Sequence, residues 1–368
     1  MIRLKSIDNF RGITIIAMLW LHFSDWWISG DFIWFVDFSL LVVNYIFWVS
    51  FQFISGISTI LFYKSRIAKI GTSELKRKKT VKREFILRAL LLLIVSLIYN
   101  ASIAITISDP RYFWSLFILL SIAISLIMMR PLLDCSKLTK LYLGIFFMGF
   151  NFIVLSFLQK FEGQLNLFGV IYHILFYPIT LHPIFSSFAA FLIGSVVGEL
   201  LYDIYIKEDQ ERRRKLLKRR IIIPSLVIGG ILILFVYSVQ SAQILNLPSF
   251  YHIISSMGIS LILFSIFIII EEYGIFKTKK SYKFIFYFSY YSLTIYLVHN
   301  LLYFLFFSML SLPALLFLLP LTIVIIGLLL QQLYKRTSSN FALKVIIGKL
   351  AHRITRIIEE KEVIEILE

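Results

Sequence analysis

Apolar residues along this chain gather in long runs, separated by charged or aromatic-rich stretches. A helix that crosses a lipid bilayer needs roughly 20 mostly apolar residues. The pattern predicts ten such helices, at about residues 10–27, 38–63, 85–107, 112–130, 140–158, 184–205, 221–242, 253–271, 284–307 and 313–334. The predicted fold class is therefore all-α, a polytopic transmembrane helical bundle of about 10–11 helices.

Lysine and arginine are unevenly distributed among the predicted loops. Residues 64–83 contain nine of them and residues 207–220 contain eight, whereas residues 24–37 contain three aspartates and no basic residue. Because cytoplasmic loops collect lysine and arginine, the pattern predicts a multi-pass protein of the cell membrane with both termini in the cytoplasm. A further apolar stretch, 165–182, is interrupted by Pro178. We expect a re-entrant or interfacial segment there, since a crossing would place the second basic loop outside.

Composition supports a membrane protein and excludes other classes. The 368 residues are 59% hydrophobic, with a mean hydropathy of +0.86, whereas soluble domains are about 45–50% apolar. The net charge of +16 follows the topology and suits anionic lipid, so a membrane-lipid partner and no nucleic-acid partner are expected. Cys135 is the only cysteine, and the spans lack His-x₃-His spacing, so no disulfide and no metal are predicted. No glycine-rich phosphate loop follows a strand, which argues against a kinase or ATPase.

The C-terminal part of the chain is a separate predicted element. Residues 1–335 are assigned to the transmembrane domain and residues 336–368 to a cytoplasmic amphipathic tail helix. Seven apolar residues recur every three or four positions from Phe341 to Ile358, with lysines and arginines among them. The acidic end that follows either projects away from the membrane or pairs with the basic loops. Helix packing or a homodimer contact is the alternative to a helix on the membrane face.

One histidine stands inside the first apolar span. The segment RLKSIDNFRGITIIAMLWLHFSDWW begins with charged residues and closes with Trp26 and Trp27. At 1.5 Å per residue, His22 lies roughly 16 Å above Arg11, near mid-membrane or a little outside it. An ionisable residue in an apolar span is costly and is by default a functional candidate. The alternative is a histidine that only bonds a neighbouring helix or lies at the headgroups.

A second histidine, His299, lies in the outer half of the span 284–307. Three more histidines fall on the outer side or in the re-entrant piece, and only one is in the tail: His173, His182, His252 and His352. A cavity lined by neutral imidazoles suits general-base chemistry, because histidine titrates near neutrality and burial favours its unprotonated form. His22 and His299 are the stronger pair, since each is within an apolar span.

Other polar residues near these histidines have weaker signals. Asp25 follows His22 by three residues and shares its face if the helix continues, so it would orient the imidazole; the alternative is an exposed loop acid. Asn300 offers an amide donor for an oxyanion, but it does not share a helical face with the adjacent His299. Asn44 belongs to a polar set in the second span that fits interhelical hydrogen bonding.

These residues also carry a family resemblance. The opening RLKSIDNFRGITIIAMLWLHF resembles the signature of the heparan-alpha-glucosaminide N-acetyltransferase-like multi-pass membrane acyltransferases, in which an aspartate and an Arg-Gly pair precede the first span. Here these are Asp8, Arg11 and Gly12, and many relatives have a histidine in the place of His22. Three later segments agree in the same order: FQFISGIS at 51–58, HPIFSSFAAFLIGSVVGELL at 182–201 and FYFSYYSLTIYLVHNLLYFL at 286–305. The last aligns His299 with a family histidine.

The resemblance implies a fold of about eleven helices. It also implies transfer of an acetyl or short acyl group from cytosolic acetyl-CoA or another acyl-CoA to a hydroxyl or amine of a sugar, glycolipid or other acceptor at the outer side. His22 would be the base or a transient acyl carrier, and His299 would line the reaction chamber. Asp8 and Arg11 would order the cytosolic mouth. We add three candidate substrate- or CoA-binding residues: Asn44, His182 and Asn300.

One feature departs from the family pattern. The lysosomal sugar acetyltransferases have an active-site histidine in the loop after the first span, whereas this chain has none between Ser24 and Asp37. An aminosugar acceptor is therefore in doubt. The alternative function is a proton-coupled transporter or flippase that uses the intramembrane histidines. Binding of acyl-CoA separates the two, because the enzyme requires it and the transporter does not.

Overall fold

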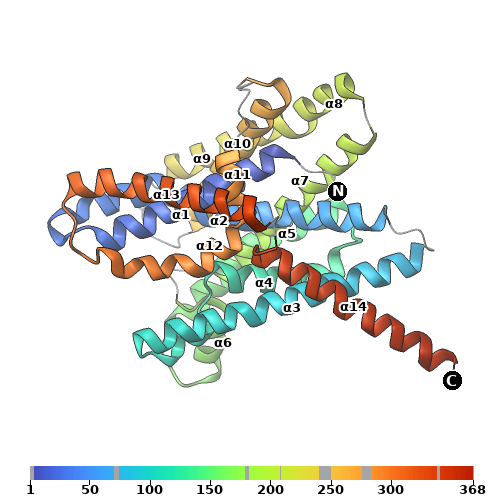
Figure 1. Cartoon of the computed structure of the whole chain (residues 1–368), viewed down its shortest axis with the longest axis horizontal. Coiled ribbons are helices and arrows are strands. Elements are labelled where there is room, and N and C mark those ends of the chain that lie inside the picture. Colours follow the sequence, from blue (N-terminus) through green and yellow to red (C-terminus); the bar gives the residue numbers. More distant parts are fainter. Residues whose placement is uncertain are drawn as a thin grey trace. The chain divides into compact units, whose positions relative to one another are not determined.

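The computed structural model describes residues 4–69, 74–178, 182–207, 209–239, 250–275, 283–337 and 340–367. Every long regular element in these ranges is a helix (Figure 1). Fourteen are α-helices: α1 Lys5–Trp27, α2 Ile33–Ile67, α3 Glu74–Ile107, α4 Ile118–Met129, α5 Lys137–Leu158, α6 Leu167–Phe176, α7 Ile184–Lys207, α8 Gln210–Leu217, α9 Ile223–Val239, α10 Phe250–Tyr273, α11 Lys283–Tyr290, α12 Ser292–Val298, α13 Leu312–Thr337 and α14 Leu343–Leu367. The all-helical class predicted from the sequence is confirmed.

Seven stretches of the described chain are long and apolar enough to cross a membrane. They are Lys78–Ile107, Pro110–Leu132, Lys137–Phe161, Ile184–Ile206, Gln210–Val239, Phe250–Tyr273 and Leu312–Thr337. Each coincides with one of the ten predicted spans, and two more predicted spans fall on α1 and α2. In the described part of 165–182, residues 165–178 and 182, the one helix is the ten-residue α6, which ends at Phe176 and is too short to span a bilayer.

The predicted span 284–307 is not one continuous helix. It is divided into α11, α12 and a 3₁₀ helix, η6, at His299–Leu305. Tyr291 separates the first two with a backbone conformation of φ −97° and ψ 18°, outside the helical region. The depth expected for His299 from a straight helix therefore does not apply, and this histidine begins the 3₁₀ segment instead.

Two basic stretches assigned to loops are largely helical. Residues 74–83 form the first turns of α3, and α8 continues through a π-helical turn, η5 at Lys218–Ile222, into α9. Helix caps account for some element starts elsewhere. The Ser136 side chain accepts a hydrogen bond from the N–H of Thr139 at the start of α5, and that of Asn166 accepts one at the start of α6.

The chain forms two compact units. Unit 1 comprises residues 52–209 and 346–368, together with the first two residues, and unit 2 comprises Arg3–Phe51 and Gln210–Val345. Each unit has its own packing.

In unit 1, α2 and α7 cross with their backbones in contact. A Cβ atom at Gly56 would overlap the carbonyl oxygen of Phe191, and one at Gly194 would overlap that of Phe53. Only glycine fits at these two positions without moving a backbone. Small residues serve the same purpose in membrane helices generally, where close van der Waals contact replaces the hydrophobic effect.

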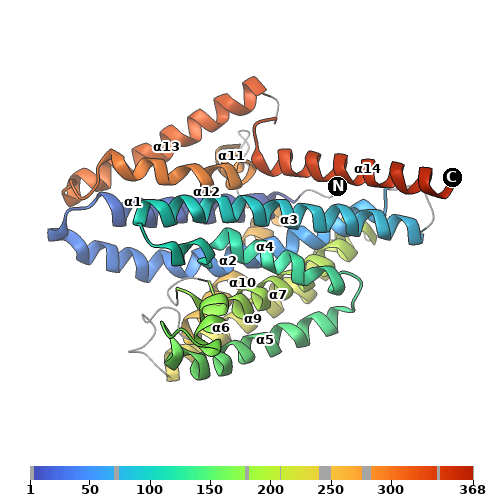
Figure 2. The ribbon, with the colours of Figure 1, turned by 90° about the horizontal axis from the view of Figure 1, so that it is seen from below.

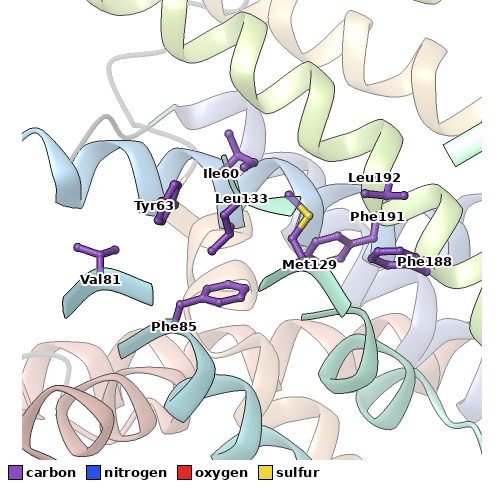
Figure 3. Packing of buried hydrophobic residues seen from close by; sticks show 9 residues of the cluster. All are labelled: Ile60, Tyr63, Val81, Phe85, Met129, Leu133, Phe188, Phe191 and Leu192. Carbon is purple, nitrogen blue, oxygen red and sulfur yellow. The ribbon is translucent and has the colours of Figure 1, made fainter. Parts of the chain in front are cut away.

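A cluster of buried side chains fills the space beside this crossing (Figure 3). Tyr63 and Leu133 lie between α3, which contributes Val81 and Phe85, and the residues of α7. The remaining members are Ile60, Met129, Phe188, Phe191 and Leu192. The cluster joins α2 and α3 to α7, to the end of α4 and to the turn that follows it.

A charged pair is buried within unit 1. Lys140 is fully buried and its Nζ donates to a carboxylate oxygen of Glu199, which is 4% exposed. The same ammonium group donates to the carbonyl of Leu133 at 3.2 Å. The two charges therefore compensate each other in a place where an unpaired charge would be costly.

The tail helix α14 packs along the start of α3, as Figures 1 and 2 show in red and blue. The carboxylate of Glu362 accepts hydrogen bonds from Arg83 and, at 3.3 Å, from Lys79. That of Glu359 accepts one from Thr80. Of the two arrangements expected for the acidic end, the structure has the one in which it pairs with basic residues.

The glycine contacts predict that replacing glycine by alanine changes the apparent Tm in opposite directions at two positions. Gly194→Ala should lower the apparent Tm by several degrees, because the new methyl group meets the backbone of Phe53 and overpacking costs about 1–3 kcal/mol. Gly149→Ala, on an open face of α5, should leave the Tm unchanged or raise it, since alanine is about 0.5–1 kcal/mol better than glycine in a helix. Thermal unfolding in detergent measures both. Equal shifts of the same sign would contradict the close crossing.

The buried pair predicts non-additive stability. Glu199→Leu leaves the ammonium group of Lys140 buried without its carboxylate, which costs about 3–5 kcal/mol. Lys140→Met/Glu199→Leu removes both charges and should recover most of that loss. The comparison is made by apparent Tm and by the yield of monodisperse protein. A double variant as unstable as Glu199→Leu would show that the pair is not the source of the cost.

Candidate active site

In unit 2, α1 lies unusually close to α11 because residue 12 has no side chain. A Cβ atom at Gly12 would overlap the backbone carbonyl oxygen of Ile285. α1 also contacts α10, α12 and α13. A larger residue at this position would push α1 away from α11, and with it everything that α1 carries. The Arg-Gly pair seen in the sequence thus has a structural reason at its second residue.

The C-terminal end of α1 is fixed to the segment that follows η6. The N–H of Ser308 donates to the carbonyl of Trp26, at 2.8 Å. The N–H of Leu310 donates to the carbonyl of Trp27, also at 2.8 Å. The buried indole of Trp27 donates in turn to the carbonyl of Leu302 in η6, at 2.9 Å. These bonds satisfy carbonyl groups that a helix end leaves without partners, and they set α1 in register with η6.

This register places His22 and His299 side by side. The ring centroids of His22 and His299 are 5.0 Å apart. The ring of Trp26, one helical turn after His22, stacks on His22 at 4.9 Å and on His299 at 5.6 Å. His299 is only 3% exposed, whereas His22 and Trp26 are half-buried. Two segments far apart in the sequence therefore supply one cluster of imidazoles.

The hydrogen bond of His299 identifies its tautomer. Its Nδ1 atom is 2.7 Å from the carbonyl oxygen of Tyr296. A carbonyl oxygen can only accept, so Nδ1 carries the proton. In the neutral ring Nε2 then bears the lone pair, which can accept a hydrogen bond or a proton. The buried imidazole is thereby oriented by the backbone of the same helical turn.

Asp8 and Arg11 lie at the opposite end of α1. Three turns of helix, roughly 16 Å, separate Arg11 from His22. The hydroxyl of Ser289 donates to the Asp8 carboxylate at 3.3 Å. The carboxylate of Glu271 in α10 accepts from the N–H groups of Lys5 and Ser6, at 2.9 and 2.6 Å, and so caps the helix. The structure does not bring this charged end together with the histidines.

The remaining candidates are distributed over the chain. Asp25 is exposed at the end of α1, and Asn300 is half-buried in η6 next to His299. Asn44 lies in α2, but its side chain is outside the described part of the structure. His182 belongs to unit 1, where its carbonyl accepts from Ser121 at 2.7 Å. Burial lowers the pKa of His182 to about 3, so this imidazole is neutral at physiological pH.

Sequence reasoning did not identify two features. Trp26 was noted only as the end of a span, whereas its ring packs on both imidazoles. The buried pair of Lys140 and Glu199 was also missed. The available signal was a single glutamate within the apolar run 184–205 and a lysine at the foot of another span; an ionisable residue in such a run needs a partner.

Comparison with known proteins assigns the chain to a family. A family model described as heparan-alpha-glucosaminide N-acetyltransferase, catalytic, matches residues 3–242. No curated protein matches the chain. The matched range includes His22 and both residues of the Arg-Gly pair, and it ends before His299. Since it covers well over half of the sequence, this multi-pass membrane protein belongs to the family of the heparan-alpha-glucosaminide N-acetyltransferase catalytic domain.

Proposed function

We propose that this protein is an acyltransferase that moves an acetyl or short acyl group across the membrane. The donor would be cytosolic acyl-CoA, and the acceptor a hydroxyl or amine of a sugar, a glycolipid or another molecule at the outer side. The observation that supports this best is the contact between His22 and His299 within unit 2. Family membership supports the reaction class and acetyl-CoA as the acetyl donor, and it leaves the acceptor unspecified.

His22 has two possible roles in this proposal, as a nucleophile or as a base. As a nucleophile, an imidazole nitrogen attacks the thioester carbonyl, the C–S bond breaks and CoA leaves as the thiol; the acceptor then takes the acyl group from the imidazole. As a base, His22 removes the proton from the acceptor hydroxyl or amine while that group attacks the thioester carbonyl. The C–S bond then breaks, and the imidazolium gives the proton to the sulfur, so that CoA leaves as the thiol. His22 is half-buried, so it retains access for a substrate.

His299 would be the second member of the chamber. With Nδ1 bound to the Tyr296 carbonyl, its Nε2 can receive the proton or hold the acceptor by a hydrogen bond. Trp26 would keep the two imidazoles in place through its stacking contacts. Asn300 would donate to the oxyanion and Asp25 would orient His22, while Asp8, Arg11 and Asn44 would contact the donor or acceptor.

The central test is transfer of labelled acetyl from acetyl-CoA by the protein in proteoliposomes. His22→Ala should reduce labelling of a lipid, a sugar or the protein itself at least about 100-fold, since a general base contributes about 10²–10⁴-fold. His299→Ala should also reduce it. His173→Ala, a half-buried histidine in α6, is the matched control and should retain activity.

Two outcomes decide against the proposal. Wild-type protein that is folded, yet neither binds acetyl-CoA nor transfers its acetyl group, would exclude the enzyme and favour transport. Full transfer by His22→Ala would remove this histidine from the chemistry. Because the readout follows the acetyl label, the labelled product also identifies the acceptor.

The stacking contacts predict graded effects at Trp26. Trp26→Ala removes the ring that packs on both imidazoles and should lower the transfer rate roughly 10- to 100-fold, because small displacements of reacting groups have effects of this size. Trp26→Phe keeps an aromatic face there and should retain most of the rate. Trp34→Ala, at an exposed position of α2, serves as the control. Equal rates for Trp26→Ala and Trp34→Ala would show that the stack does not position the histidines.

A further inference from the structure

The interruption between α11 and α12 creates a helix end inside a region that the sequence predicts as one span. α11 ends at Tyr290 and α12 begins at Ser292, with Tyr291 in a non-helical conformation between them. The last four carbonyl groups of a helix have no partner within it. The carbonyl of Ser289 lies in the last turn of α11, so its donor must come from outside that helix.

The first two residues of α14 supply donors on both sides of this interruption, all within unit 2. The ammonium group of Lys344 donates to the backbone carbonyl of Ser289 at 3.0 Å. It also lies over the ring of Tyr290, 4.9 Å from the centroid. The backbone N–H of Leu343 donates to the hydroxyl oxygen of Thr294, in the first turn of α12, at 3.2 Å. The start of α14 therefore holds the end of α11 and the start of α12 together.

A lysine suits the end of α11 for electrostatic reasons. The C-terminal end of a helix carries a partial negative charge, and lysine side chains can bind its last carbonyl groups. The face of the Tyr290 ring adds a cation–π contact to the same ammonium group. Ser289 is fully buried, and its hydroxyl donates to the Asp8 carboxylate at 3.3 Å. A cation and an anion thus meet on one buried residue beside the interruption.

The position of α12 depends on what holds its two ends. It has only seven residues, Ser292–Val298, and so short a helix makes few backbone bonds of its own. Beyond its C-terminal end, the indole of Trp27 donates to the carbonyl of Leu302 in η6 at 2.9 Å. At its N-terminal end, Thr294 accepts from the start of α14. Because His299 follows α12 directly, a shift of this helix would move the imidazole of His299.

We propose that Lys344 is a positioning residue for the contact between His22 and His299. It acts through the backbone of α11 and α12, because its bond to Ser289 fixes the interruption from which α12 and η6 continue. With this bond in place, the imidazole of His299 stays 5.0 Å from that of His22. The effect on acyl transfer rests on the proposed function, whereas the position of His299 does not.

The reactivity of each imidazole tests this role without any catalytic activity. Full-length protein in detergent is treated with diethyl pyrocarbonate, and modification of each histidine is followed by mass spectrometry of its peptide. His299 is 3% exposed, so its modification follows the population of locally opened protein. Lys344→Met should speed this reaction about tenfold, as expected for loss of a hydrogen bond to a charged group. His252, 2% exposed in α10 of the same unit, should keep its rate.

Three further variants separate positioning from general loss of stability. Lys344→Arg keeps a charged donor and should leave the reactivity of His299 as in the wild type. Thr294→Val removes the acceptor of the Leu343 N–H and should speed the reaction less, since a neutral hydrogen bond is worth less than a charged one. Lys335→Met, at an exposed position near the end of α13, is the matched control and should change nothing.

The outcomes distinguish this inference from the proposed function. Where acetyl transfer occurs, Lys344→Met should lower kcat roughly 10- to 100-fold with an unchanged KM for acetyl-CoA, and Lys344→Arg should restore kcat. If no transfer occurs, but Lys344→Met exposes His299 alone, the positioning role stands and the function fails. If transfer proceeds and Lys344→Met changes neither kcat nor the reactivity of His299, the function stands and the positioning role fails. Equal acceleration at His252 and His299 would also overturn it, since that is general loosening.

Discussion

The absence of water from the bilayer core is the constraint on which the rest of this structure depends. In hydrocarbon, each backbone polar group needs a partner within the protein, so the long regular elements are helices. The same constraint governs the side chains. The ammonium group of Lys140 has both a carboxylate and a carbonyl around it. At the charged end of α1, the first amides donate to the carboxylate of Glu271. Polar groups are satisfied in specific pairs, and these pairs fix which helices can be neighbours.

The contact between His22 and His299 also depends on polar groups that need partners, here at the C-terminal end of α1. The last carbonyls of α1 need donors, and the N–H groups of Ser308 and Leu310 supply them. Because these donors follow η6 directly, the bonds that complete α1 also bring η6 beside it. The contact between His22 and His299 therefore does not rest on attraction between two imidazoles. It is a consequence of backbone hydrogen bonding a few residues away, with Gly12 allowing the close approach at the other end.

The sequence predicted the kind of element well, because apolar length is a local signal. The number differs: about 10–11 helices are predicted, whereas the described residues form fourteen α-helices and seven stretches long and apolar enough to cross a membrane. Each predicted span overlaps one or more helices of the described residues, and the pairing of the acidic tail was among the expected arrangements. The interruption at Tyr291 could not be predicted, since no proline or glycine marks it and the apolar run continues through it. For the site, His22 and His299 could each be identified from the apolar residues around them in the sequence, but their contact depends on pairing between residues far apart in the sequence. The stacking of Trp26 on both imidazoles depends on the same long-range pairing.

The position of the second imidazole bears on how this chain differs within its family. Residues 24–37, which lack a histidine, contain only the end of α1, the short 3₁₀ helix Gly30–Phe32 and the start of α2. No imidazole can come from that connection. The ring beside His22 comes from η6, which lies beyond the range that the family model matches. An acceptor in such a chamber would meet a wall supplied by the C-terminal part of the chain, so features outside residues 3–242 would determine which acceptor fits.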